Sequence, residues 1–251
     1  MGTDITFLSG LPRTGSTLLT SILSQNEQIH TQGNSALCQL MWDTQVSCWN
    51  TEQIKNSPDV PDKLLGAIPN IFYSGINKHI VDKCRSWTLP ANLELIDRYI
   101  TKSPKIVVML RPIVDIVKSF VFIRQMNGWN NPEEGLLDDN SEPIMRSLNG
   151  VKHSKSVNSG QFLYVWYDDL LGNPQETIDK IYNFCGWDKF EHNFEDIKNL
   201  TPERDDLLNL IGLHDIRPQL SRRSIDIKLS DKLYDKAVQL DKEMGTNDSK
   251  E

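Results

Sequence analysis

The sequence predicts an α/β fold of three layers, in which helices cover both faces of a mainly parallel central sheet. Short apolar runs alternate with longer amphipathic segments, as strands and helices do in such folds. The run 106–110, Ile-Val-Val-Met-Leu, is continuously apolar, which is typical of a strand covered on both faces. Near the start of the chain, a strand, a glycine-containing turn and a helix follow one another in the order of a phosphate-binding loop.

Apolar spacing and proline positions predict the first elements. Residues 5–8 form a short strand, and residues 16–23 form a helix with apolar side chains at 18, 19, 22 and 23. The segment 36–49 has apolar residues near helical spacing and predicts a second helix. Pro61 is well placed to start a third helix, which we expect to bend at Pro69.

The middle of the chain supplies two more strands. The run 80–83 is short and extended and ends in charged residues, and Pro90 then starts a helix with one apolar face. The run 106–110 is the clearest strand of the sequence. Pro112 follows it and is placed at the start of another helix with an apolar face.

Capping and turn-forming residues divide the last part of the chain. Asn, Pro, Glu, Gly and Asp are frequent at 128–140, which predicts a loop. Asn173-Pro174 and Thr201-Pro202 each combine a capping residue with a proline, as helix starts do. The predicted elements are a polar helix from Ser141, a strand at 162–166, helices at 173–186 and 201–212, and a last helix from Ser230.

Length and composition set bounds on the function. The chain has 251 residues, of which 38% are hydrophobic and 24% charged, so we expect one packed domain over 1–251 with a polar tail at 245–251. A net charge of −7 argues against non-specific binding of nucleic acid. The sequence shows no charged-then-apolar leader and no long apolar run, so we expect a cytoplasmic protein without membrane contact. The oligomeric state stays open.

The cysteines do not indicate a disulfide frame or a zinc site. The sequence has four, without any Cys-x-x-Cys pairing: Cys38, Cys48, Cys84 and Cys185. We therefore expect reduced thiols of an intracellular protein. No cluster of His, Cys and Asp offers metal ligands, and we expect chemistry without a metal.

Charged and polar residues come directly after each predicted strand. They are the turn 10–17, Asp82 with Lys83, Arg111, and the stretch 167–169. A parallel sheet binds its ligands beyond the carboxyl ends of its strands. We therefore expect these residues to surround the ligand.

The turn after the first strand indicates which anion is bound. Gly10 and Gly15 fit the spacing of a nucleotide triphosphatase loop, but Ser16 stands where that loop has its lysine. The stretch Pro-Arg-Thr-Gly-Ser-Thr instead resembles the 5′-phosphosulfate loop of sulfotransferases, which reads Pro-(Lys/Arg)-Ser-Gly-Thr-(Thr/Ser). The resemblance implies that the 5′-phosphosulfate of 3′-phosphoadenosine-5′-phosphosulfate (PAPS) is held by Pro12, Arg13, Thr14, Gly15, Ser16 and Thr17.

A second motif follows the strand 106–110. Ser119 lies eight residues after Arg111, about two turns into the following helix, so a guanidinium and a hydroxyl can converge on one phosphate. This Arg-x7-Ser pattern resembles the 3′-phosphate site of sulfotransferases. The stretch 166–186 resembles the family's Tyr-Glu-Asp-Leu, Asn-Pro and Phe-Leu-Gly segment, which implies that Tyr167 lies beside the adenine.

Residues 214–223 form a cluster of basic side chains late in a chain whose net charge is negative. Sulfotransferases place a basic loop, often Arg-Lys-Gly, over the 3′-phosphate, and this chain lacks that motif. We take Arg222 as the residue that substitutes for it, with Arg217 and Arg223 as open alternatives. A solvated basic turn is the competing interpretation.

Several residues compete for the role of general base. Tyrosylprotein-type sulfotransferases have a Glu soon after the first helix, and that position falls at Asn34, which cannot act as a base. The stretch 80–87 resembles the Glu-Lys-Ser-x-x-Tyr segment of heparan-type enzymes, which implies that Asp82 is the base and Lys83 a sulfuryl contact. A strand-end ion pair between these two residues is the alternative. His79 is the second candidate base, because histidine titrates near neutral pH.

The resemblance implies a PAPS-dependent sulfotransferase that releases 3′,5′-ADP. The acceptor would be a hydroxyl or amine of a small molecule, a glycan or a peptide, and Arg13 would neutralise charge on the leaving phosphate. One alternative is a P-loop kinase or nucleotide triphosphatase, which would have an acid after a strand where this chain has Arg111. Another is a nucleotide-binding protein on the same fold without catalytic activity.

Overall fold

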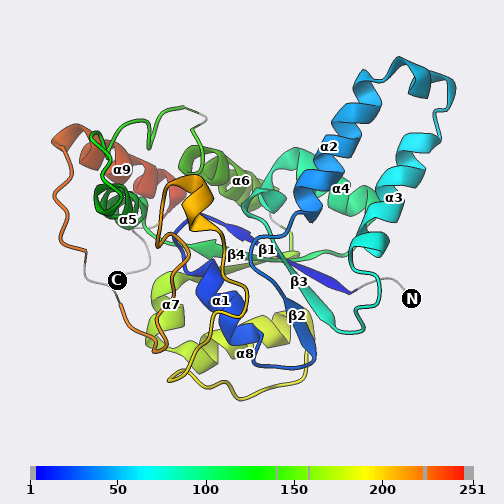
Figure 1. Ribbon diagram of the computed structural model, residues 1–251. Coiled ribbons are helices and arrows are strands. Elements are labelled where there is room, and N and C mark those ends of the chain that lie inside the picture. Colours follow the sequence, from blue (N-terminus) through cyan, green and yellow to red (C-terminus); the bar gives the residue numbers. More distant parts are fainter. Residues whose placement is uncertain (1–3, 140, 158, 223–224, 246–251) are drawn as a thin grey trace.

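The computed structural model describes residues 4–139, 141–157, 159–222 and 225–245. Its centre is a five-stranded sheet with the order β2-β3-β1-β4-β5, in which every neighbouring pair of strands is parallel. The strands are β1 (Ile5–Gly10), β2 (Ile29–Thr31), β3 (His79–Lys83), β4 (Lys105–Leu110) and β5 (Phe162–Trp166). Helices lie on both faces of this sheet (Figure 1), which confirms the predicted three-layer α/β fold.

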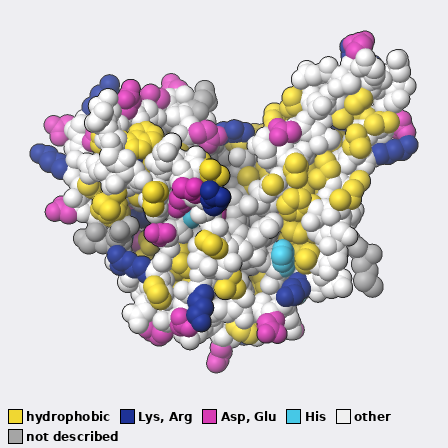
Figure 2. Space-filling model, viewed as in Figure 1, with side chains coloured by type: hydrophobic (Ala, Val, Ile, Leu, Met, Phe, Trp, Pro, Cys, Tyr) yellow, Lys and Arg dark blue, Asp and Glu magenta, His cyan; other side chains and the backbone are white. Residues whose placement is uncertain are grey.

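The helices divide between the two faces. One face is covered by α1 (Ser16–Leu23), α7 (Tyr167–Gly172) and α8 (Pro174–Cys185). The other carries α4 (Pro90–Tyr99), α5 (Ile113–Met126), α6 (Ile144–Val157) and α9 (Asp231–Met244). Helices α2 (Leu37–Asn50) and α3 (Val60–Phe72) pack together as an arm that projects from the body, with a hollow beside it (Figures 1 and 2).

Both faces of the sheet are packed, and this explains the continuous apolar character of its strands. Along β4, Ile106, Val108 and Leu110 belong to the core cluster on one face. Val107 and Met109 alternate with them and belong to the cluster on the other face. A strand with two buried faces is mostly apolar along its length, and β4 is followed directly by the polar residue Arg111 at its carboxyl end.

A buried carboxylate connects α9 to the beginning of α5. Asp241 Oδ1 accepts a hydrogen bond from the Ile113 amide at 2.6 Å, and Oδ2 accepts one from the Val114 amide at 3.2 Å. These two N–H groups have no partner within their own helix, and the negative charge suits the positive end of the helix dipole. The contact fixes the start of the helix that carries Ser119.

The predicted helix at 201–212 is wrong. The structure has only one 3₁₀ turn there, η3 (Asp205–Leu208). Leu207, Leu208 and Ile211 are exposed, so this segment buries no continuous apolar face that would stabilise a helix. The short elements β2 and α7, and the 3₁₀ turns η1 (Glu52–Asn56) and η2 (Arg85–Thr88), were not predicted because they are too short to show a period.

Two further observations concern expectations from the sequence. All four cysteines are free: Cys38 and Cys48 lie on α2, Cys84 precedes η2 and Cys185 ends α8. Within the ranges that the structure describes, no helix is long and apolar enough to cross a membrane. The predicted polar tail beyond Gly245 lies outside the described residues.

Candidate functional site

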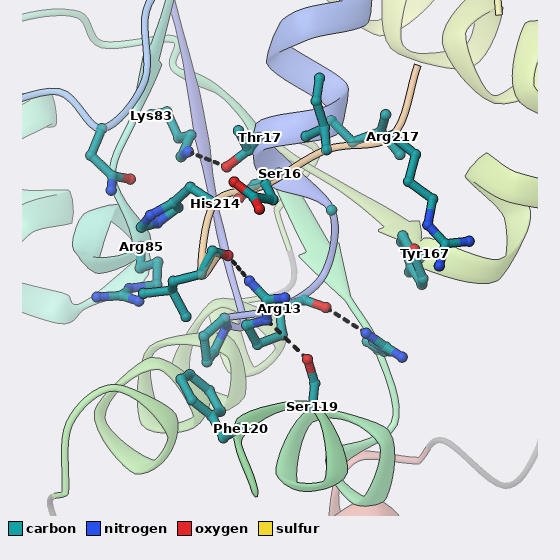
Figure 3. Close-up of a pocket in the computed structure, with 18 of the residues that line it drawn as sticks. Arg13, Ser16, Thr17, Lys83, Arg85, Ser119, Phe120, Tyr167, His214 and Arg217 are labelled. Atoms are coloured by element: carbon teal, nitrogen blue, oxygen red, sulfur yellow. Dashed lines mark hydrogen bonds between the residues drawn. The ribbon is translucent and has the colours of Figure 1, made fainter. Parts of the chain in front are cut away.

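The carboxyl ends of β1, β3 and β4 border a cavity of about 320 Å³. It is also lined by the segment 213–217, which crosses in front of the sheet edge (Figure 3). The predicted site residues that line it are Pro12, Arg13, Gly15, Ser16, Thr17, Lys83, Arg111, Ser119 and Tyr167. The structure therefore brings together residues that lie far apart in the sequence.

The turn between β1 and α1 requires its glycines. At Gly10, with φ 121°, a Cβ atom would lie 2.2 Å from the carbonyl oxygen of Met109. At Gly15, with φ 76°, a Cβ atom would lie 2.8 Å from the ring of Tyr167. Arg13 also adopts a positive φ, 59°, without being glycine. Successive residues in such conformations turn backbone N–H groups toward a common concave side, which suits an anion.

Thr14 is the member of this turn whose side chain faces away from the cavity. It is fully buried, and its hydroxyl donates a hydrogen bond to the carbonyl oxygen of Leu11 at 2.8 Å. Its side chain therefore closes the turn. Only its backbone remains available to an anion.

Arg13, Arg111 and Ser119 form one connected group. Arg111 Nη1 donates a hydrogen bond to the backbone carbonyl of Arg13 at 2.9 Å, and Arg13 Nε donates one to Ser119 Oγ at 3.0 Å (Figure 3). Arg13 Nη1 also donates to the carbonyl oxygen of Leu213, on the segment that crosses the cavity. Two cations and a hydroxyl thus meet beside the turn.

Arg111 is a nearly buried cation, and one of its N–H donors makes no hydrogen bond in the described part of the chain. Its side chain is 11% exposed, burial lowers its pKa, and Asp115 lies 3.8 Å from its Nε. The same Nε is buried and makes no hydrogen bond within the described part of the chain. Its guanidinium lies 4.8 Å from the ring centre of Tyr167. A nearly buried guanidinium that lines a cavity and has an unused hydrogen-bond donor fits an anionic ligand such as a phosphate.

Lys83 lies at the end of β3 and points toward the turn (Figure 3). Its side chain is 4% exposed, and Nζ donates hydrogen bonds to Thr17 Oγ1 at 3.0 Å and to Glu203 Oε1 at 3.3 Å. Burial lowers the pKa of Lys83, and the carboxylate of Glu203 opposes that shift. The lysine is therefore held beside the anion-binding turn by a carboxylate from another segment.

Asp82, predicted as the general base, lies outside the cavity lining. It is fully buried, and its carboxylate accepts hydrogen bonds of 2.6 Å each from Ser35 Oγ, Tyr73 OH and Trp87 Nε1. Burial raises its pKa. Asp82 does not form the strand-end ion pair with Lys83, because neighbouring residues of a strand face opposite sides of the sheet. With these three donors on its carboxylate and no access to the cavity, Asp82 has the surroundings of a structural residue.

His79, the second candidate base, lies at the amino end of β3 and does not line the cavity. Its Nδ1 is 2.8 Å from Asp4 Oδ2, and its ring packs on that of Trp187, with 5.5 Å between the centroids. The cavity is at the opposite end of the strand. The structure thus separates both predicted bases from the other site residues.

His214 lines the cavity, although no pattern in the sequence indicates such a role. Its Nδ1 lies 2.5 Å from Asp205 Oδ1, and its backbone N–H donates to Asp205 Oδ2 at 2.8 Å. Its Nε2 lies 3.5 Å from Glu203 Oε2. Asp205 accepts a hydrogen bond from Nδ1 and orients the ring, and the carboxylate of Glu203 lies on the Nε2 side. This segment has no regular period, and its one sequence signal is the basic cluster that His214 begins.

The basic cluster is only partly at the site. Arg217 lines the cavity, whereas Arg222 pairs with Asp168, is 57% exposed and does not line it. Arg223 lies outside the described residues. The placement of Arg222 therefore does not support the role taken for it, and Arg217 is the residue of this cluster that the structure brings to the cavity. Among the residues with described positions, no group of three or more His, Cys, Asp or Glu is arranged to hold a metal ion.

Comparison with known proteins bears on the family and the fold. A family model described as "Sulfotransferase family" matches residues 6–192. A protein of Caenorhabditis briggsae, named as a candidate protein-tyrosine sulfotransferase, is 22% identical over 199 residues, which are 72% of this chain and 65% of that protein. The match thus spans less than two thirds of the relative's length.

Solved structures share the fold. The sulfotransferase domain of an olefin synthase from Synechococcus PCC 7002 aligns with a TM-score of 0.60 at 17% identity, covering 97% of this chain and 95% of that domain. A mouse sulfotransferase complexed with PAP aligns with a TM-score of 0.50 at 13% identity, covering 98% of this chain and 86% of that one. At such identities the likeness shows the fold alone.

Proposed function

Because this chain belongs to the sulfotransferase family, we propose that it transfers a sulfuryl group from PAPS to a hydroxyl or amine of an acceptor. The family and the fold support sulfuryl transfer as the reaction. The observation that carries the choice of donor is the nearly buried guanidinium of Arg111, which lines the same cavity as Ser119 and the turn residues and whose Nε makes no hydrogen bond in the described part of the chain. Two anion-binding groups around one cavity fit a ligand that has phosphate at both its 3′ and 5′ positions.

The donor site is built from three parts of the chain. The backbone of the turn, with Ser16 and Thr17, would hold the 5′-phosphosulfate, and Arg111 with Ser119 would hold the 3′-phosphate. Tyr167 would lie beside the adenine. When bound, PAPS supplies the sulfuryl group and its remainder leaves as 3′,5′-ADP.

Arg13 and Lys83 would stabilise the charge that moves during transfer. As the acceptor oxygen bonds to sulfur and the bond from sulfur to the phosphate oxygen breaks, negative charge develops on that phosphate. A cation that the fold holds in place stabilises such charge more strongly than water does, because it need not reorient during the reaction. Lys83 is held near the turn by Thr17, and Arg13 is part of the turn itself.

We propose His214, in place of Asp82, as the general base. Its Nε2 would take the proton of the acceptor hydroxyl while Asp205 keeps Nδ1 protonated and orients the ring. His214 lines the same cavity as Lys83, whereas Asp82 does not. For the acceptor, the name of the Caenorhabditis relative supports testing a tyrosine-containing peptide before small phenols and amino sugars.

The proposal is tested by measuring the transfer of radiolabelled sulfate from PAPS to a panel of acceptors. A parallel assay offers ATP with Mg²⁺ as the alternative donor. We expect labelled product and release of 3′,5′-ADP without added metal. Phosphate transfer from ATP would instead support the kinase alternative. Binding of 3′,5′-ADP without transfer to any acceptor of the panel would support a nucleotide-binding protein without catalytic activity.

A further inference from the structure

Glu203 does not line the cavity, yet its carboxylate contacts three residues that form the cavity wall. Oε1 accepts hydrogen bonds from the backbone amide of Asn34 at 3.1 Å and from Lys83 Nζ at 3.3 Å. Oε2 accepts one from the side-chain amide of Asn34 and lies 3.5 Å from His214 Nε2. The side chain is only 18% exposed. One carboxylate thus joins residues from three different segments.

The first consequence concerns the charge of Lys83. This lysine is held among Thr17 from α1, Arg85 from η2 and Glu203, which lies just before η3. Burial and the cation Arg85 both lower its pKa, and Glu203 is the group that raises it. An ammonium that is removed from water stays charged only if an opposite charge lies nearby. The charge of Lys83 therefore depends on Glu203.

The second consequence concerns the position of His214. The segment that carries Glu203 and His214 has one short 3₁₀ turn, and Leu207, Leu208 and Ile211 on it are exposed. Leu213 anchors the end of this segment in the core, with Leu210 packed beside it, whereas polar contacts hold its beginning against the sheet edge. The contacts of Glu203 with Asn34 and Lys83 are among them.

We propose that Glu203 is a positioning residue, which keeps Lys83 protonated and fixes the segment bearing His214 opposite it. This role rests on the proposed function, in which Lys83 contacts the sulfuryl group and His214 is the base. Glu203 itself needs no contact with either substrate. Its removal should affect the charge at Lys83 without emptying the donor site.

The titration of Lys83 tests the first part of this role without any substrate. Competitive labelling with acetic anhydride, read by mass spectrometry over a range of pH, reports the fraction of neutral amine at Lys83. In Glu203→Gln we expect half-titration at a lower pH than in the parent, because the neutral side chain no longer favours the ammonium. Asp206→Asn, which removes an exposed carboxylate of the same segment, is the matched control and should match the parent. Identical Lys83 titration in Glu203→Gln and the parent would overturn the proposal.

Donor affinity and kcat test how Glu203 affects the site when substrates bind, through the charge of Lys83 and the position of His214. In Glu203→Gln at alkaline pH, we expect the affinity for PAPS to fall relative to that for 3′,5′-ADP, because only PAPS carries a sulfuryl group for Lys83. As the pH is lowered this difference should shrink, while kcat stays reduced, and Glu203→Asp should restore most of both. An equal loss for both nucleotides at every pH would indicate a merely structural residue and contradict the proposal. If the parent bound neither nucleotide, the proposed function would fail, and the labelling result for Lys83 would stand independently.

Discussion

Arg111 Nη1 donates a hydrogen bond of 2.9 Å to the backbone carbonyl of Arg13, which joins the end of β4 to the turn before α1. The same Arg13 has a φ of 59° and donates through Nε to Ser119, on the helix that follows β4. A non-glycine residue in this conformation is retained only when its surroundings hold it there. Hydrogen bonds of Arg13 therefore join the two halves of the proposed donor site.

Replacing Arg13 should lower turnover more than donor affinity. In Arg13→Gly the turn keeps its conformation without strain, but the guanidinium is lost. We expect kcat to fall about 10²–10³-fold, because charge on the leaving phosphate develops only in the transition state. The affinity for 3′,5′-ADP, measured by calorimetry, should change less. A variant that loses affinity but keeps kcat would remove Arg13 from the catalytic role.

Replacing His214 should abolish base catalysis and leave the donor site intact. His214→Asn is expected to lower kcat about 10²–10⁴-fold, with unchanged affinity for 3′,5′-ADP. His79→Asn is the matched control, because His79 lies at the other end of β3 and is paired with Asp4. Measuring kcat of both variants with the same acceptor decides which of the two histidines acts as the base. Loss of turnover in His79→Asn alone would reverse the assignment.

Replacing Asp82 should affect stability, with a defined dependence on pH. Asparagine has one acceptor oxygen for the donors of Ser35, Tyr73 and Trp87, so Asp82→Asn leaves a buried donor unsatisfied, at a cost of about 1–3 kcal/mol. Burial raises the pKa of Asp82 in the folded protein above its ordinary value of 3.8. Its contribution to the stability of the parent is therefore fully present below 3.8 and lost as the pH rises through the folded pKa.

The deficit of Asp82→Asn relative to the parent should accordingly be larger at about pH 4, near the unfolded pKa of 3.8, than at about pH 8, because asparagine does not ionise. Urea unfolding of both proteins at the two pH values measures it. A deficit that grows with pH would mean that the folded protein lowers the pKa of Asp82. That result would contradict the expected direction of the shift.

Replacing Asp241 should weaken the start of α5. Asp241→Ala leaves the amides of Ile113 and Val114 without their partner and is expected to lower the free energy of unfolding by about 1–2 kcal/mol. Asp235→Ala, an exposed position on the same helix, is the control and should have little effect. Thermal unfolding compares the two. Equal melting temperatures for the parent and Asp241→Ala would show that the contact contributes nothing measurable.

The sequence was sufficient for the parts of the fold that local pattern determines. The strand 106–110 is apolar on both faces because two cores lie against it, and the glycines at 10 and 15 are required by close approach of Met109 and Tyr167. Both features are encoded within a few residues. Elements of this kind could be predicted, together with the edge of the sheet at which the ligand residues gather.

The proposed base, His214, could not be predicted, for two physical reasons. His214, Asp205 and Glu203 lie on a segment with little regular structure, so tertiary contacts alone bring them to the cavity. The expectation that Asp82 and Lys83 both lie at the site did not take into account the alternation of side chains along a strand. Adjacent residues of a strand face opposite sides of the sheet, so only Lys83 reaches the cavity.

The central claim is that Arg111 binds the 3′-phosphate of the donor in this cavity. Calorimetric titration with 3′,5′-ADP of the parent, Arg111→Ala and the exposed control Arg98→Ala tests it most directly. Losing a buried, charge-assisted contact costs about 2–5 kcal/mol, so we expect Arg111→Ala to bind about 30-fold to several thousand-fold more weakly, with Arg98→Ala unchanged. Equal affinity of Arg111→Ala and the parent for 3′,5′-ADP would contradict the claim.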